Sequence, residues 1–172
     1  GDNGCQQDII SIFNGEAIHG GRQDHTEIGT HVPMFVYWPG TVQGGVVNDD
    51  LVDFTDFLPT IAGIAGVPVP VNYGTLDGTS FYPRLLGQTG TPRDYIFCHY
   101  QPFPDLPNTQ TYRWAQNKTY KLYDTSSSKG GGRFFNIAND IYEKTPLKQS
   151  SLTEAEKALL KQFQAVFARM HK

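Results

Sequence analysis

This sequence has no long apolar run and no surplus of basic residues, and it contains only two cysteines. No uninterrupted apolar stretch approaches the roughly 18 residues that cross a bilayer, so we expect no membrane partner. The chain carries 14 Lys and Arg against 17 Asp and Glu, a formal net charge of -3, so we expect no nucleic-acid partner. Cys5 and Cys98 decide little about the redox compartment and favour two unpaired thiols over one disulfide.

What the sequence does contain is sufficient apolar material for a packed core. The length of 172 residues predicts a globular chain, and 38% hydrophobic with 13% aromatic residues are enough to fill its interior. Glycine is frequent, with 18 residues, and several of these lie beside polar side chains in short motifs. Function is therefore sought first in those motifs.

Four motifs rich in glycine or proline fall within the first forty positions. In order they are Asp2-Asn3-Gly4, Gly20-Gly21-Arg22, Gly29-Thr30-His31-Val32-Pro33 and Trp38-Pro39-Gly40. Adjacent oxygen donors on a tight turn, such as Asp2 and Asn3, suit a hard cation, and a cation with the basic Arg22 nearby suits an anionic ester. Because Ca²⁺ takes about 6–8 oxygen ligands, this stretch alone predicts only part of a site.

The amino-terminal quarter is predicted to be an ordered arm and a binding loop. Residues 8–13 alternate apolar and polar side chains and end at the turn signal Asn14-Gly15. Residues 16–30 are polar and rich in glycine without a helix or strand period, so we predict a loop that carries binding residues.

The next segment has the pattern of the edge of an α/β sandwich. The apolar run 33–38, stopped by Pro39-Gly40, predicts a strand buried on both faces. A second strand is expected around residues 46–52. A helix should follow, beginning close to Asp56 and ending at Gly66.

The carboxyl-terminal half has a different pattern. We predict a small antiparallel sheet with strands in residues 95–100, 112–117, 119–123 and 133–137. A capping box formed by Thr153 and Glu156 should begin a final helix, and its apolar stripe predicts that it lies across the sheet.

The ordered set of motifs resembles the C-terminal part of a type I sulfatase, of the arylsulfatase kind within the alkaline phosphatase superfamily. That family has an Asp-Asn-Gly, a Gly-Gly-Lys, and a Gly-x-Arg/His-Val-Pro leading to Trp-Pro-Gly, in the order found here. Residues 51–60, 77–81 and 120–123 continue the family's order at similar spacing. The resemblance covers nearly the whole chain.

The resemblance implies a fold class and a domain division. The expected class is α/β: the C-terminal part of an alkaline phosphatase-like sandwich, followed by a small four-stranded antiparallel sheet packed with a C-terminal helix. Residues 1–90 would belong to the α/β catalytic domain and residues 91–172 to the sheet-and-helix subdomain.

The resemblance also implies the site. Asp2 and Asn3 would hold a divalent cation, Ca²⁺ or Mg²⁺, and Arg22 would contact the sulfate group as a catalytic and substrate-binding residue. Relatives carry lysine where Arg22 stands; arginine keeps the charge but is a poor proton donor. His99, at the end of a predicted strand, is assigned to substrate binding. The expected substrate is a sulfate ester, and a sulfated carbohydrate is one candidate.

The family's nucleophile is absent. It is a formylglycine made from the first residue of a Cys/Ser-x-Pro-Ser-Arg motif, and neither Cys5 nor Cys98 is followed by that pattern. The resemblance implies that the parent protein is a sulfuric ester hydrolase. Because the nucleophile is absent, we expect this chain alone to be inactive. We also expect self-association through surface that the rest of the parent would cover.

Several alternative interpretations stay open. Asp2-Asn3-Gly4 suits a plain turn, and Arg22 could be a solvated loop residue. His99 could equally be a packed or surface histidine. At the level of function, a phosphate or phosphonate ester hydrolase of the same superfamily fits the same motifs. So does a non-catalytic truncated module that binds sulfated sugars.

Overall fold

The computed structural model describes residues 1, 3–70, 72, 74–103, 105 and 109–170. The chain divides into two compact units. One consists of Gly1–Met34 with the chain from Phe97 onward, and the other of Phe35–Ile96. The boundary expected between residues 90 and 91 concerns the domains of a parent protein and stays a prediction.

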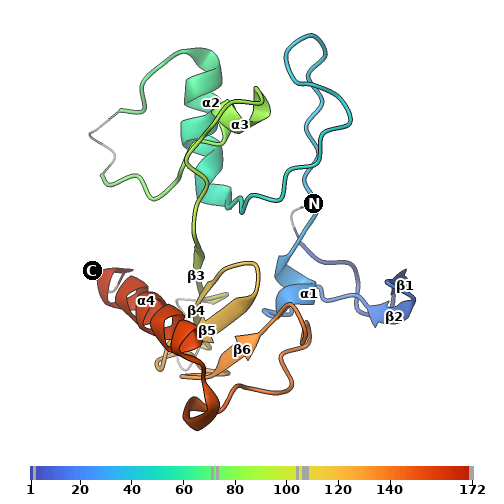
Figure 1. Cartoon of the computed structure of the whole chain (residues 1–172), viewed down its shortest axis with the longest axis vertical. Helices are drawn as coiled ribbons and strands as arrows, with labels where there is room; N and C mark the ends of the chain where they lie inside the picture. Colours follow the sequence, from blue (N-terminus) through green and yellow to red (C-terminus); the bar gives the residue numbers. More distant parts are fainter. Residues whose placement is uncertain (2, 71, 73, 104, 106–108, 171–172) are drawn as a thin grey trace. The chain divides into compact units, whose positions relative to one another are not determined.

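A four-stranded antiparallel sheet is the centre of the first unit (Figure 1). Its strands are β3 (Ile96–Tyr100), β4 (Tyr112–Gln116), β5 (Tyr120–Tyr123) and β6 (Phe134–Asn136), paired in chain order. Asn117 closes the β4–β5 hairpin, because its side-chain oxygen accepts hydrogen bonds from the backbone nitrogens of Thr119 and Tyr120. The four strands predicted from the sequence are confirmed.

The two faces of this sheet differ in chemistry. Directly opposed residues on neighbouring strands share a face. Trp114 lies opposite Tyr123, and Lys121 lies between Gln116 and Phe135, which places all five on one face. The other face carries Ala115, Leu122 and Phe134.

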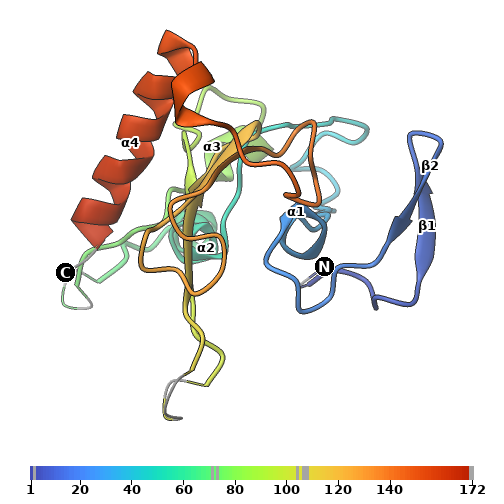
Figure 2. The same cartoon turned by 90° about the horizontal axis from the view of Figure 1, so that it is seen from below.

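Helix α4 (Glu154–Met170) covers the apolar face (Figure 2). Its buried residues are Phe163, Val166 and Phe167, and the Phe163 ring meets the Phe134 ring edge-on at 6.5 Å. The predicted capping box is confirmed: the Thr153 backbone nitrogen donates to Glu156, and the Glu156 backbone nitrogen donates to the Thr153 hydroxyl. The α/β class with a C-terminal helix on a four-stranded sheet is thus confirmed. No helix in the described part of the chain is long and apolar enough to span a membrane.

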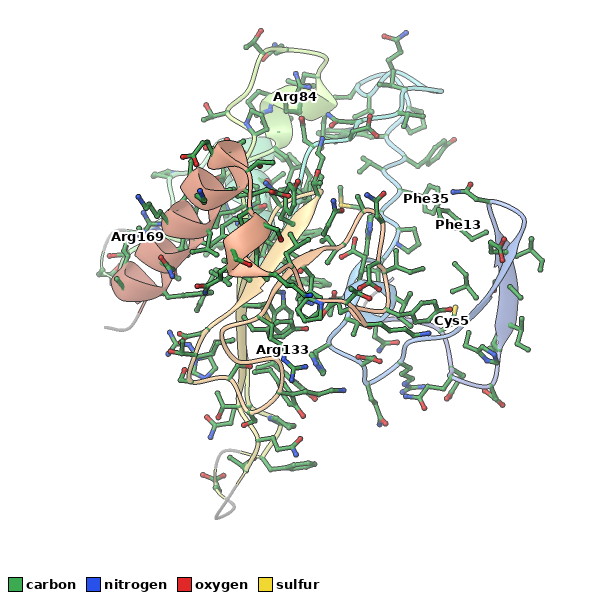
Figure 3. The ribbon with its side chains drawn as sticks, turned by 60° about the horizontal axis from the view of Figure 1, so that its bottom comes forward. Cys5, Phe13, Phe35, Arg84, Arg133 and Arg169 are labelled. Carbon is green, nitrogen blue, oxygen red and sulfur yellow. The ribbon has the colours of Figure 1, made fainter. Side chains whose placement is uncertain are left out.

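A separate hairpin precedes the sheet. Strands β1 (Ile10–Phe13) and β2 (Glu16–His19) pair antiparallel around Asn14 and Gly15, whose φ angles are 51° and 83°. The prediction that residues 16–30 form only a loop was therefore wrong, because two positive φ angles in a two-residue turn direct the chain back alongside β1. Phe13 is exposed near the turn (Figure 3). A short helix, α1 (Glu27–Thr30), follows β2.

The second unit contains short helices joined by long irregular segments. The 3₁₀ turn η1 (Phe54–Asp56) leads into α2 (Phe57–Ala65), and α3 (Tyr82–Leu85) packs against α2. The predicted start near Asp56 is confirmed, as is the end at Gly66, which has a φ of 67°.

In the first unit, a short 3₁₀ helix, η3 (Gln149–Ser151), precedes α4.

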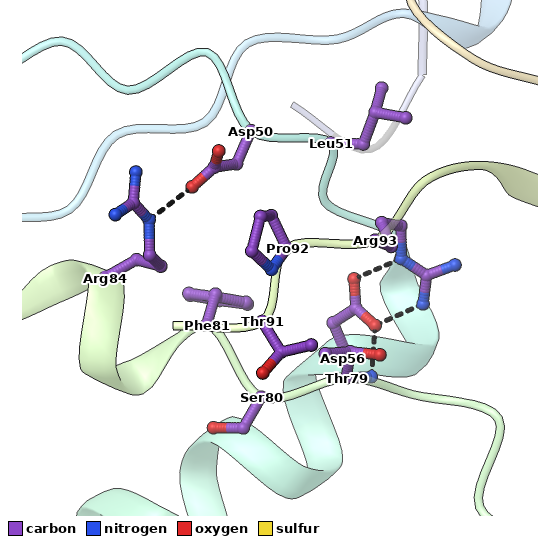
Figure 4. A pocket seen from close by; sticks show the side chains of 10 residues that line it. All are labelled: Asp50, Leu51, Asp56, Thr79, Ser80, Phe81, Arg84, Thr91, Pro92 and Arg93. Carbon is purple, nitrogen blue, oxygen red and sulfur yellow. Dashed lines mark hydrogen bonds and ion pairs between the residues drawn. The ribbon is translucent and has the colours of Figure 1, made fainter. Parts of the chain in front are cut away.

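A small cavity in the second unit is lined mainly by polar and charged side chains (Figure 4). Buried Asp56 accepts hydrogen bonds from Arg93 and from the backbone nitrogen of Thr79, and Asp50 pairs with Arg84 at 2.6 Å. With a volume of about 10 Å³ the cavity holds no more than a water molecule. We interpret these ion pairs as structural ties.

Two predicted strands are not formed. Residues 33–38 have no strand structure, and the Phe35 and Tyr37 side chains are 91% exposed. Around residues 46–52 the structure has a single bridge, between Leu51 and Arg93. The apolar pattern is that of a buried strand, but a strand needs a neighbour to pair with, and none of the described residues supplies one to 33–38.

Candidate active site

The amino-terminal segment lies directly against the loop that carries Arg22. The backbone nitrogen of Gly4 donates to the carbonyl of Gly29 at 3.2 Å, and that of Arg22 donates to the carbonyl of Cys5 at 2.8 Å. The side chain of Gln7 donates to the Arg22 carbonyl at 3.0 Å. Cys5, labelled in Figure 3, marks this segment. The first and second glycine motifs of the sequence are thus brought together by main-chain hydrogen bonds.

Glycine is needed here because the backbones touch. A Cβ on Gly21 would lie 2.6 Å from the backbone nitrogen of Gly29, and one on Gly29 would lie 2.2 Å from the carbonyl of Asp24. Real Cβ atoms do not approach backbone so closely. The Gly-Gly and Gly-x-His motifs therefore encode close approach of two chain segments.

Arg22 occupies a tight turn on this packed base. The Asp24 backbone nitrogen donates to the Gly21 carbonyl at 2.8 Å, and the third turn residue, Gln23, has a φ of 70°. The turn holds the Arg22 main chain while its side chain is exposed. A guanidinium presented in this way can form two parallel hydrogen bonds with a tetrahedral oxyanion.

The predicted metal ligands are only partly described. Asp2 lies outside the described residues, and Asn3 is exposed on a bend next to Gly4. Within the described ranges no group of three or more His, Cys, Asp or Glu side chains could hold a metal ion. The metal-binding roles of Asp2 and Asn3 stay predictions.

The loop after Arg22 is anchored to the polar face of the sheet by a buried lysine. The ammonium of Lys121 donates to the His25 carbonyl at 2.5 Å and to Glu143 at 2.8 Å. The side chains of Lys121 and Glu143 are 0% and 4% exposed. The Tyr123 hydroxyl donates to the second oxygen of Glu143 at 2.5 Å.

A second anchor joins the same loop to β4. The side-chain nitrogen of Gln116 donates to Glu27 at 3.1 Å, while its oxygen accepts from the indole of Trp114 at 2.8 Å. The other Glu27 oxygen lies 2.7 Å from the His31 ring nitrogen, and this hydrogen bond raises the pKa of His31. His31 therefore steadies α1 through an i,i+4 contact.

The His25 ring is packed among aromatic side chains. It stacks on Tyr112 with centroids 4.6 Å apart and meets Tyr123 edge-on at 5.6 Å. Burial, with the nearby Lys121 and Lys129 charges, lowers the pKa of His25 to about 4, against the opposing effect of Asp24. His25 is thus neutral at pH 7.

His99 lies in β3 and is exposed. Its neighbour Tyr100 stacks on Tyr112 at 6.1 Å, and Tyr112 stacks on His25. A ladder of rings therefore connects the strand of His99 with the loop of Arg22. The substrate-binding role of His99 stays a prediction.

The residues that sequence reasoning missed are the anchors, Lys121 and Glu143 above all. A signal was present, because Lys121 alternates with Tyr120 and Leu122 in a strand and its position faces inward with Tyr123. A charged residue at an inward-facing strand position indicates a buried partner. The partner, Glu143, follows in a loop twenty-two residues later and has no local pattern.

Comparison with known proteins finds several sulfatases that are similar in sequence to this chain. The family model described as "N-sulphoglucosamine sulphohydrolase, C-terminal" matches residues 23–169. Human arylsulfatase A is 39% identical over 49% of this chain and 16% of its own length. The ulvan-active sulfatase of Formosa agariphila is 34% identical over 64% of this chain and 22% of its own. Rat arylsulfatase G is 27% identical over 76% of this chain and 27% of its own.

These relatives define a class, the sulfatases. The chain belongs to the N-sulphoglucosamine sulphohydrolase C-terminal family, because the family model matches most of its length. The predicted resemblance to a sulfatase is confirmed. The chain spans only 16–27% of the length of the relatives named above, and the family match begins one residue after Arg22.

Proposed function

We propose that the protein to which this chain belongs hydrolyses sulfate monoesters, and that this chain provides the part of the active site that contacts the sulfate. Membership of a sulfatase C-terminal family and the sulfatase names of its relatives support the reaction class. The single observation that carries the site is the main-chain pairing of residues 4–5 with Gly29 and Arg22. It gathers the two motifs on one rigid base.

In this proposal Arg22 binds the sulfate oxygens. Its exposed guanidinium, on a turn whose main chain is fixed at both ends by hydrogen bonds, offers charge and two parallel donors. A donor at this position would stabilise negative charge that develops on the sulfate in the transition state. Because arginine is a poor proton donor, the leaving oxygen would be protonated by another group.

Asp2 and Asn3 are proposed as ligands of Ca²⁺ or Mg²⁺. Asn3 is exposed and precedes Gly4, which hydrogen-bonds to Gly29, and an amide oxygen is a ligand that a hard cation prefers. The two residues fit part of a coordination shell, and the remaining ligands would come from other regions of the parent protein. When bound, such a cation would neutralise charge on the sulfate oxygens.

No residue of this chain lies in the sequence motif in which a cysteine or serine is converted to formylglycine. The two cysteines are followed by Gln6 and by His99, not by the motif that the modification needs, and Cys5 and Cys98 form no disulfide with one another. We therefore propose that the nucleophile lies elsewhere in the parent protein and that this chain alone does not turn over substrate.

A sulfated carbohydrate is the proposed substrate class. His99 is exposed, and Tyr100, the next residue of β3, is 45% exposed at the end of the aromatic ladder, on the opposite face of the strand. An exposed aromatic face suits the apolar face of a sugar ring, and an exposed histidine at the same end of the strand can donate to sugar or sulfate oxygens.

We also propose that the isolated chain self-associates. The exposed apolar side chains of the second unit include Phe35 and Tyr37, and large exposed apolar patches drive association. Sedimentation velocity would show dimers or larger species that dissociate in the double variant Phe35→Ser/Tyr37→Ser. A monomer across the concentration range would contradict this proposal.

The test of function is an assay of the chain joined to its native upstream region. We expect hydrolysis of an aryl sulfate in preference to an aryl phosphate. Arg22→Met should reduce kcat/KM by about 100-fold or more, as the loss of one oxyanion donor does. Arg22→Lys should retain most of the activity, since it restores the charge.

A matched control is Arg169→Met, which removes a guanidinium from α4 (Figure 3) and should leave the rate unchanged. The double variant Asp2→Ala/Asn3→Ala should reduce activity unless Ca²⁺ is raised. Preference for the phosphate ester, or an unchanged rate in Arg22→Met, would overturn the proposal.

A further inference from the structure

We propose that Lys121 and Glu143 are positioning residues, which hold the loop of Arg22 in the geometry required for sulfate contact. This inference rests on the proposed function for its biological meaning, but its physical content is separate. The buried ion pair between Lys121 of β5 and Glu143 of the loop after β6 sets the conformation of residues 20–31. Neither residue is assigned to contact substrate.

The contacts of Lys121 are specific. Its ammonium is fully buried, with the His25 carbonyl and a Glu143 oxygen as hydrogen-bond acceptors. It also lies 4.5 Å from the centroid of the Trp114 ring and 5.0 Å from that of Tyr123, within the range of cation–π attraction. One of its two acceptors therefore belongs to the loop of Arg22, three residues after Arg22.

Glu143 completes the arrangement. One oxygen accepts from Lys121 and the other from the Tyr123 hydroxyl, so both oxygens are satisfied. Its backbone has a φ of 53°, a conformation that is uncommon for a residue other than glycine. These contacts hold Glu143 in a strained conformation that presents its carboxylate to the lysine.

A stabilising role alone does not account for this pair. Burying two charges costs several kcal/mol per ion, and well-packed apolar residues of similar volume often stabilise a fold as well or better. Burial lowers the pKa of Lys121 and raises that of Glu143, which shows the cost of leaving water, while their mutual contact opposes both shifts. An apolar replacement, however, could not bind a backbone carbonyl.

The effect reaches Arg22 through a short, hydrogen-bonded path. The His25 carbonyl is fixed by Lys121, and the Asp24 backbone nitrogen closes the turn on Gly21. Arg22 lies within that turn. The second anchor, Glu27 to Gln116, fixes the far end of the loop and limits the alternative paths of the chain.

The test compares two variants of the 172-residue chain by amide hydrogen exchange. Lys121→Met removes the buried ammonium, and Phe163→Leu is the control that weakens the α4 face without contacting the loop. In Lys121→Met the Arg22 and Asp24 amides should exchange at least about tenfold faster relative to the β4–β5 amides, as expected for losing a hydrogen bond to a charged group. In Phe163→Leu this ratio should be unchanged.

A second readout is the pKa of His25, measured by NMR. The charged groups around its ring are Lys121, Lys129 and Asp24, and its ring neighbours are Tyr112 and Tyr123. Lys121→Met should raise the pKa of His25 from about 4, since one of the causes that lower it is gone. A merely structural weakening, as in Phe163→Leu, should not.

Glu143→Gln covers the case in which Lys121→Met fails to fold. It keeps the side-chain shape and should accelerate the same loop amides to a smaller extent. Equal acceleration in Phe163→Leu, or an unchanged loop in both polar variants, would overturn the inference. If the parent protein hydrolysed no sulfate ester, the proposed function would fail while these exchange ratios still decided the role of Lys121.

Discussion

The two faces of the four-stranded sheet are covered by opposite means. Toward α4, the contacts are between apolar side chains, such as Phe134 with Phe163. Toward the amino-terminal loop, the sheet presents Lys121, Gln116 and Tyr123, each of which hydrogen-bonds to the loop or to Glu143. One face of the sheet is therefore covered by apolar packing, and the other face by directional hydrogen bonds.

This difference separates stability from positioning. Apolar packing is non-directional and accepts many side chains of suitable volume. Hydrogen bonds to a buried charge fix the partner atoms within a few tenths of an ångström and are costly when one partner is lost. A loop that must present an arginine in a set direction gains more from the second kind of contact.

The largest expected effect comes from removing one partner of the buried Lys121–Glu143 ion pair. Glu143→Ala leaves the buried ammonium of Lys121 without its counter-ion and should lower the free energy of unfolding by about 3–5 kcal/mol, measured by urea denaturation. The double variant Lys121→Met/Glu143→Leu should recover most of that loss, because no charge is left buried. A double variant as unstable as Glu143→Ala would mean that the pair itself is required for stability.

The apolar face should respond to volume and not to polarity. Phe163→Ala empties a fully buried site against Phe134 and should cost about 3 kcal/mol. Phe163→Leu leaves a smaller cavity and should cost less than Phe163→Ala does. Denaturation curves of the two variants give the comparison, and equal losses would show that the face depends on ring contacts instead of volume.

The pH dependence of stability should come in part from the polar face. The pKa of His25 is about 4 in the folded chain and 6.5 in the unfolded chain, so the unfolded state binds more protons between these values. The contribution of neutral His25 to the free energy of unfolding should be fully present above pH 6.5. It should be lost as the pH falls toward 4, which lowers the free energy of unfolding by about 1–2 kcal/mol once solvent screening is allowed for.

His25→Phe keeps the stacking on Tyr112 but removes the titration, so its thermal midpoint should fall less across this range. His19→Phe, at an exposed strand position, is the matched control and should behave as the unmodified chain does. Identical pH profiles for His25→Phe and the unmodified chain would argue against a buried neutral imidazole.

The smallest effect concerns the start of α4. Thr153→Ala removes the hydroxyl that accepts from the Glu156 backbone nitrogen and should cost about 1 kcal/mol. Thr153→Ser keeps the hydroxyl and should be nearly neutral. Both changes should leave the exchange of the Arg22 loop unaffected, which would confirm that the helix face and the loop face are independent.

Local patterns were sufficient to predict the sheet and its helix. The strands in residues 112–117 and 119–123 and the capping box at Thr153 each depend on neighbours in sequence, and each is confirmed. The strand expected at 33–38 was wrong because its pairing depends on residues that the described chain does not supply.

The anchors of the candidate site could not be predicted for a related reason. Lys121 binds a carbonyl 96 positions away and a carboxylate 22 positions away. A backbone carbonyl has no sequence signature, and a glutamate in a loop is ordinarily solvated. Arg22 and Asn3 were identified through their motifs, and the structure adds the main-chain bonds that bring their segments together.

The most direct test of the account is a double-variant cycle on kcat/KM for sulfate ester hydrolysis, in the chain joined to its upstream region. The variants are Lys121→Met, Arg22→Met and their combination. If Lys121 acts by positioning Arg22, the two losses will not add, and the double variant will be about as slow as Arg22→Met alone. Losses that multiply independently would contradict the account.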